Sequence, residues 1–91
     1  MLELDPIEAR VLGCLLEKQR TTPDAYPLSL NSLRLACNQL TNRDPVVNYD
    51  EETVELALQR MHTRELTRIA GGHSSRATKY RHLLEDKMGI T

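Results

Sequence analysis

The chain has 91 residues, a length that predicts one small domain rather than several. Its 12 basic and 13 acidic residues nearly cancel, which excludes a polycation that binds nucleic acid by overall charge. It contains neither an apolar run long enough for a membrane span nor a recognisable signal peptide, so we expect a cytoplasmic protein with no membrane partner.

The first predicted element is a helix that begins at Asp5. Asp5 can accept a hydrogen bond from the first turn, Pro6 suits the first helical position, and Glu8 has the spacing of a capping box. An apolar stripe with helical periodicity follows, and the helix is expected to end near Lys18 to Arg20. The stripe consists of Ile7, Val11, Leu12, Cys14, Leu15 and Leu16.

A loop over residues 21–27, with two prolines, leads to a second helix that should begin at Ser29. Residues 41–48 have no helical stripe, so they predict a connection longer than the usual helix-turn-helix turn. The polar residues of 38–44 either fold this connection through bonds to its backbone or read bases and phosphates. The inner face predicted for the second helix is Leu30, Leu33, Ala36, Cys37 and Leu40.

Asp50 is predicted to cap a third helix that ends near Arg64 and turns Val54, Ala57, Leu58 and Met61 toward the core. Two alternating segments follow, residues 65–70 and 76–82, and Gly71-Gly72 between them suits a tight hairpin turn. A short strand near Tyr26 to Leu28 could supply a third member of the sheet.

This order of elements predicts a mainly α fold with a small β-hairpin, in the α+β class. The specific prediction is a winged helix-turn-helix with three helices and a two- or three-stranded antiparallel wing. We assign residues 1–84 to this domain and residues 85–91 to a C-terminal tail or short helix.

Residues that commonly carry chemistry form no recognisable site. Cys14 and Cys37 lie in helical apolar patterns and are interpreted as two reduced core thiols, without a close Cys/His pair that could begin a metal site. His62, His73 and His82 are expected to be exposed or to lie on the hairpin. We therefore predict no enzymatic activity, no cofactor, no metal and no small-molecule ligand.

The charges are distributed unevenly. Residues 50–59 contain four acids and no base, whereas residues 60–82 contain six bases against one acid. Cations on a wing can contact DNA phosphates, while the acidic start of the third helix would be repelled by them. We predict phosphate contacts from Arg68, Arg76, Lys79 and Arg81, and groove contacts from Gln59, Arg60 and Arg64.

These charges leave two functions open. The first is a DNA-binding domain of a transcriptional regulator, which binds double-stranded DNA through the wing and the C-terminal half of the third helix. The second is a protein–protein interaction or dimerisation module, in which the acidic patch of one molecule meets the basic wing of another to form a homodimer. The basic hairpin could also be a solvated face that balances the neighbouring acids.

Three stretches, residues 8–19, 21–31 and 36–46, resemble in the same order the YceH-like family of bacterial proteins. The end of the hairpin, residues 76–82, is also similar, so that the resemblance covers roughly residues 4–83. It implies a winged-helix domain and suggests that relatives carry two such domains in tandem within a longer chain. It implies no activity, ligand or catalytic residue.

Overall fold

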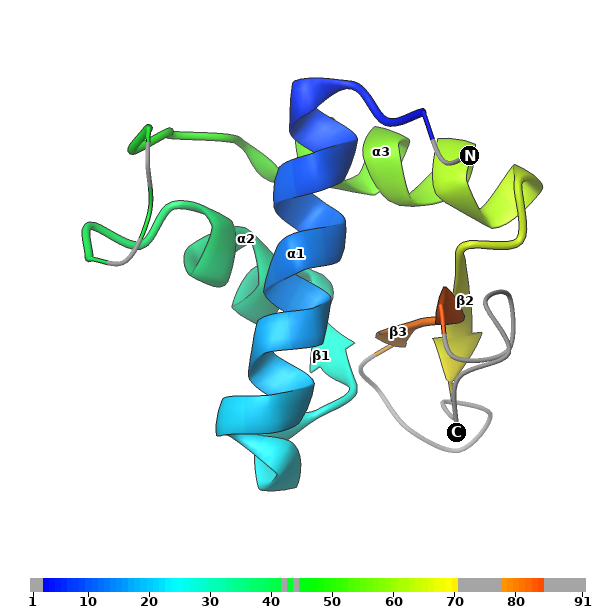
Figure 1. Ribbon diagram of the computed structural model, residues 1–91, viewed down its shortest axis with the longest axis horizontal. Helices are drawn as coiled ribbons and strands as arrows, with labels where there is room; N and C mark the ends of the chain where they lie inside the picture. The colour runs from blue at the N-terminus through cyan, green and yellow to red at the C-terminus, as the bar shows by residue number, and fades with distance from the viewer. Residues whose placement is uncertain (1–2, 42, 44, 71–77, 85–91) are drawn as a thin grey trace.

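The computed structural model describes residues 3–41, 43, 45–70 and 78–84. Figure 1 shows α1 lying across α2 and α3, with the sheet beside the end of α3. The predicted α+β class is confirmed, and the layout is consistent with a winged helix-turn-helix. The elements are α1 (Pro6–Thr21), a 3-10 turn (Pro23–Ala25), β1 (Leu28–Ser29), α2 (Leu30–Cys37), α3 (Glu51–Thr63), β2 (Thr67–Ala70) and β3 (Lys79–His82).

Each of the three helices begins at its predicted cap. The side chains of Asp5, Ser29 and Asp50 each accept a hydrogen bond from a backbone N–H in the first turn. At α1 the capping box is complete, because Asp5 Oδ1 accepts from the Glu8 N–H at 2.7 Å and Glu8 Oε1 accepts from the Asp5 N–H at 3.0 Å. These local bonds satisfy backbone donors that have no partner inside a helix.

The helix α2 ends earlier than its apolar pattern predicted. Leu40 was assigned to its inner face, and this is wrong, since Leu40 lies beyond the helix and is 81% exposed. The chain turns away at Asn38, whose Nδ2 donates to the Tyr49 carbonyl at 2.8 Å and whose Oδ1 accepts from the Tyr49 N–H at 2.7 Å. Asn38 thus helps to fold the long connection, as in the first of the two interpretations of its polar residues.

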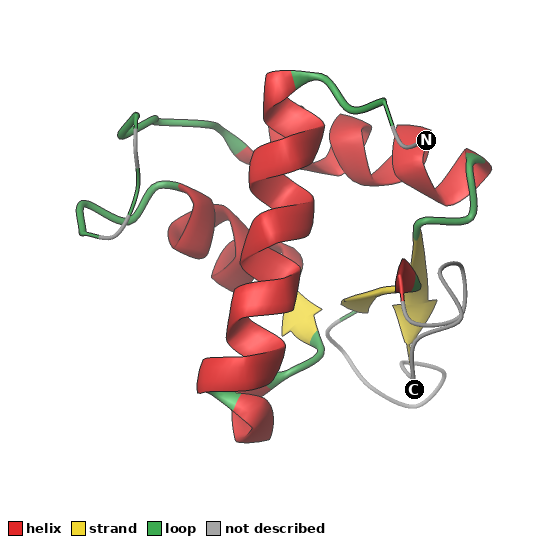
Figure 2. Ribbon diagram, in the orientation of Figure 1, coloured by secondary structure: helices red, strands yellow, loops and turns green. Residues whose placement is uncertain are grey.

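The three strands form one antiparallel sheet in the order β1-β3-β2 (Figure 2). The third strand predicted near Tyr26 to Leu28 exists, but it covers Leu28 and Ser29 instead. In the register of β2 and β3, Arg68 faces Arg81 and Ile69 faces Tyr80. The predicted turn at Gly71-Gly72, the proposed contact Arg76 and the tail 85–91 lie outside the described residues.

Apolar side chains from all three helices form the core, and Leu66 joins it from the start of the wing. A tight turn positions Leu66: its N–H donates to the Met61 carbonyl at 2.8 Å, and the Glu65 N–H donates to the His62 carbonyl at 3.0 Å. Glu65 adopts a left-handed backbone conformation with φ of 60°, as the residue after a helix often does. This turn leads α3 directly into β2 and so fixes the wing relative to α3.

His82 lies on the hairpin, as expected, but it is buried, with 1% of its surface exposed. Its Nε2 is 2.6 Å from Gln19 Oε1, and its backbone N–H donates to the Tyr26 hydroxyl at 2.9 Å. These bonds tie β3 to α1 and to the segment before β1. No helix in the described ranges has the length and apolar character needed to cross a membrane.

Candidate functional site

Arg68, Lys79 and Arg81 share one face of the sheet, which we call the basic sheet face. Strand alternation and the β2–β3 register place them opposite the face that carries the buried Thr67 and His82. Within the described part of the chain, none of the three forms an ion pair. Three of the four predicted phosphate contacts are therefore brought together.

Arg68 and Arg81 lie directly opposite each other on neighbouring strands. The Cβ atoms of such a pair are about 5 Å apart, and like charges in this position destabilise a sheet by up to ~1 kcal/mol. No described carboxylate forms an ion pair with either arginine, so their positive charges are not balanced locally. The basic sheet face thus has the electrostatics of an anion-binding surface.

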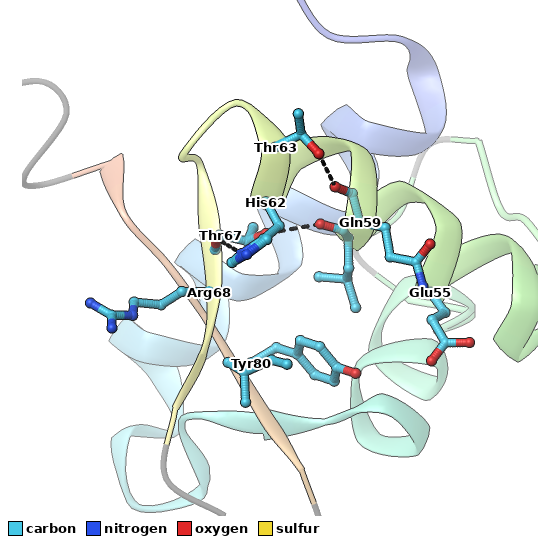
Figure 3. A pocket seen from close by; sticks show the side chains of 9 residues that line it. Glu55, Gln59, His62, Thr63, Thr67, Arg68 and Tyr80 are labelled. Atoms are coloured by element: carbon cyan, nitrogen blue, oxygen red, sulfur yellow. Dashed lines mark hydrogen bonds between the residues drawn. The ribbon is translucent and has the colours of Figure 1, made fainter.

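A groove of about 320 Å³ runs between α3 and the sheet (Figure 3). Figure 3 shows the Tyr80 ring reaching toward Glu55 on α3, while the Arg68 side chain points outward at the rim. Burial and the nearby negative charge of Glu55 raise the pKa of Tyr80. The lining residues are Glu55, Leu58, Gln59, His62, Thr63, Thr67, Arg68, Ile69 and Tyr80.

Of the three predicted groove contacts, Gln59 lines this groove, but Arg60 and Arg64 face α1. Arg60 Nη2 is 3.2 Å from Asp5 Oδ2, and its Nε is 3.4 Å from Glu8 Oε2. Arg64 Nη1 is 3.7 Å from Glu8 Oε1. Gln59 and Arg68 line the same groove, whereas acids of α1 partly balance the charges of Arg60 and Arg64.

Glu8 connects α1 to α3, and its replacement should lower stability. Glu8→Ala removes the hydrogen bond to the Asp5 N–H and the ion pairs to Arg60 and Arg64, so we expect a loss of about 2 kcal/mol. Glu8→Gln keeps an oxygen that can accept the capping bond and should lose only about half as much. Urea unfolding of the two variants measures the difference, and equal losses would contradict a capping contribution.

The first two turns of α3 are acidic at the surface. Glu51, Glu52 and Glu55 are exposed, and hydrogen bonds from Thr53 lower the pKa of Asp50 at the cap. The predicted contrast between an acidic helix start and a basic wing is therefore present in the fold. Among the residues that the structure describes, no group of three His, Cys, Asp or Glu side chains could hold a metal ion.

The family model described as "Protein of unknown function, DUF480" matches residues 4–91. A UPF0502 protein of Pelobacter propionicus is 52% identical over 87 residues, which cover 96% of this chain and 39% of that protein. A UPF0502 protein of Vibrio vulnificus is 54% identical over 80 residues, which cover 88% of this chain and 36% of that protein. One of Solibacter usitatus is 52% identical over 89 residues, which cover 97% of this chain and 42% of that protein.

The chain spans about two fifths of the length of these relatives. Their names assign no activity, so the comparisons bear on ancestry and not on what the domain binds. The match covers almost the whole chain at about half identity, in agreement with the resemblance of the three sequence stretches to an uncharacterised bacterial family. The chain belongs to the DUF480 family of proteins of unknown function.

Proposed function

We propose that this domain binds double-stranded DNA through the basic sheet face. The observation that carries the proposal is the direct opposition of Arg68 and Arg81, which no carboxylate in the described ranges balances. A DNA phosphate between the two guanidinium groups would relieve their repulsion and release counterions.

In the proposed complex the wing makes the main contacts to DNA, and the acidic start of α3 stays away from the DNA phosphates. Arg68, Lys79 and Arg81 contact phosphates, and Gln59 offers its amide separately, from the groove between α3 and the sheet. Arg60 and Arg64 contribute less, since they share their charge with Glu8. Arg76 remains a predicted phosphate contact.

The role that fits such a domain is that of a regulator of transcription in the cytoplasm. Contacts to phosphate carry no sequence information. Base selection would therefore rest on Gln59, or on a segment equivalent to the part of the longer relatives that this chain does not span. A second domain of the kind implied by the family resemblance would supply further contacts. The proposal that a longer protein containing this domain regulates transcription depends on DNA binding by the domain.

Fluorescence anisotropy with a labelled duplex at several salt concentrations tests the proposal. Four phosphate contacts predict a plot of log affinity against log salt with a slope of about −3 to −4. An absence of binding at low salt, or binding that salt does not weaken, would contradict DNA binding through the basic sheet face.

A protein-interaction module is the second candidate. Two observations favour it: the acids at the surface of the first two turns of α3, and Ile69, an apolar residue that is 55% exposed in the groove that Glu55 also lines. A basic, partly apolar surface on a partner or on a second copy would match both features. Failure to bind duplex at low salt would favour this candidate over the first.

A further inference from the structure

A second surface cavity, of about 270 Å³, lies between α1 and the connection that follows α2. It is separate from the groove beside the sheet, because no described residue lines both. Three guanidinium groups and one carboxylate line it, so the cavity carries an excess of positive charge. Besides the buried Cys14, its lining residues are Ala9, Arg10, Gly13, Glu17, Arg20 and Arg43.

Most of the cavity wall is one face of α1. Arg10, Gly13, Glu17 and Arg20 follow one another at spacings of three and four residues, so helical geometry brings them to the same side of α1. Arg43 reaches this face from the connection, where its Nη1 is 3.3 Å from Glu17 Oε2. Because Arg43 comes from a distant loop, periodicity along the chain does not reveal this cavity.

Backbone carbonyls hold two of the three guanidinium groups in place. Arg10 donates to the Cys37 carbonyl at 3.0 Å and also to the Pro45 carbonyl. Arg43 donates to the Ala36 carbonyl at 2.9 Å, and only 7% of its side chain is exposed. Groups that are already fixed lose little further conformational freedom when an anion binds to them.

The positive charge of the cavity is only partly balanced by the described residues. Arg43 pairs with Glu17, so these two charges offset each other. Arg10 bonds to neutral carbonyls, and neither Arg10 nor Arg20 forms an ion pair with a described carboxylate. A guanidinium group has five N–H donors, so Arg10 retains donors beyond those that the two carbonyls use. Arg10 and Arg20 therefore provide the excess charge.

Gly13 lies between these two arginines on α1, and packing does not require a glycine there. A Cβ at this position would meet no atom within 4 Å. Glycine in the interior of a helix is less favourable than alanine, because it loses more conformational freedom on folding. A ligand that lies against the bare backbone accounts for a glycine at this place, independently of the charges.

We propose that this cavity binds a small anion that carries a diphosphate group, held by Arg10 and Arg20 and lying against Gly13. Guanidinium groups match phosphate oxygens in bidentate geometry. The rise of the helix separates the Cα atoms of Arg10 and Arg20 by about 15 Å, so an elongated anion fits these two cations better than a single phosphate. The cavity volume is near the lower end of the range for ligand pockets, which favours a small ligand. The proposal departs from the sequence-based expectation of no small-molecule ligand.

Titration of the ¹⁵N-labelled chain with sodium pyrophosphate at low salt concentration, followed by two-dimensional NMR, tests the proposal. We expect saturable shifts that are largest at the amides of α1 around Gly13, and weaker binding of inorganic phosphate. Arg20→Ala should weaken pyrophosphate binding about tenfold, through loss of a charge-assisted hydrogen bond. Arg34→Ala removes the same charge from α2, outside the cavity, and should leave the affinity nearly unchanged. An absence of shifts, or equal losses in the two variants, would overturn the proposal.

Substitutions of Gly13 separate ligand binding from folding. Gly13→Ala should raise the melting temperature by about 2–8 °C, because alanine favours the helix and its Cβ meets no neighbour. Gly13→Leu extends further into the cavity and should weaken pyrophosphate binding at least about tenfold, while the chain stays folded and its affinity for duplex DNA is unchanged. Full pyrophosphate affinity in Gly13→Leu, or its loss in Arg68→Ala/Arg81→Ala instead, would place the anion on the basic sheet face and overturn the proposal.

Discussion

Replacement of Arg68 and Arg81 together by alanine is expected to weaken binding to duplex DNA by ~60-fold at about 0.1 M salt. The figure follows from counterion release, since each lost phosphate contact lowers the salt slope by about 0.9 and the affinity at this salt concentration by about eightfold. The loss should be similar for all duplex sequences, because phosphate contacts do not distinguish bases. Anisotropy titrations over a range of salt concentrations measure both the affinity and the slope.

The same double variant should unfold at an equal or slightly higher temperature than the unaltered chain. Its two positive charges face each other across β2 and β3, so their removal relieves a repulsion of up to ~1 kcal/mol. A matched control, Lys18→Ala with Arg20→Ala, removes two charges from the end of α1 and should leave the salt slope nearly unchanged. An equal loss of affinity in both double variants would show that overall charge, and not the basic sheet face, drives binding.

Local interactions made much of this fold predictable. The side chains of Asp5, Ser29 and Asp50 each accept a hydrogen bond from the backbone of their own helix. The start of each helix can therefore be predicted from a few consecutive residues. The alternation that places Arg68 and Arg81 on one face is a property of extended backbone. The candidate basic sheet face could therefore be predicted from the sequence, apart from the opposition of its two arginines, which depends on register.

Long-range interactions could not be predicted in the same way. Arg60 carries the charge and position expected of a groove contact, but its direction is set by Glu8 on another helix. Leu40 continues the apolar period of α2, yet the bonds between Asn38 and Tyr49 end the helix before it. Apolar periodicity predicts which side of a helix faces the core, but it does not predict which residues of other elements that side contacts.

The second large effect concerns Arg43, which joins the connection after α2 to α1. Its side chain is only 7% exposed, its Nη1 is 3.3 Å from Glu17 Oε2, and its Nε donates to the Ala36 carbonyl at 2.9 Å. Arg43→Ala leaves this carbonyl and the Glu17 carboxylate without these donors. We expect a loss of about 2–3 kcal/mol, and a fall in the melting temperature of roughly 10–20 °C for a domain of this size.

The pH dependence of this loss separates the ion pair from the bond to the carbonyl. The hydrogen bond from Arg43 lowers the pKa of Glu17 below its ordinary value of 4.5, so the unfolded chain binds a proton more readily than the folded one. The stabilisation is complete above that value and declines as the pH falls through the lower folded pKa.

Urea unfolding of the unaltered chain and of Arg43→Ala should therefore differ most at pH 6 to 8 and less at pH 3, as protonation of Glu17 removes its contribution. The remaining difference at low pH reports the bond to Ala36, which does not titrate. Arg20→Ala is the control, because Arg20 lines the same surface cavity as Glu17 and Arg43. It should change the free energy of unfolding by less than ~0.5 kcal/mol. A difference that stays constant down to pH 3 would mean that Glu17 contributes nothing, and that Arg43 acts through the carbonyl and its packing.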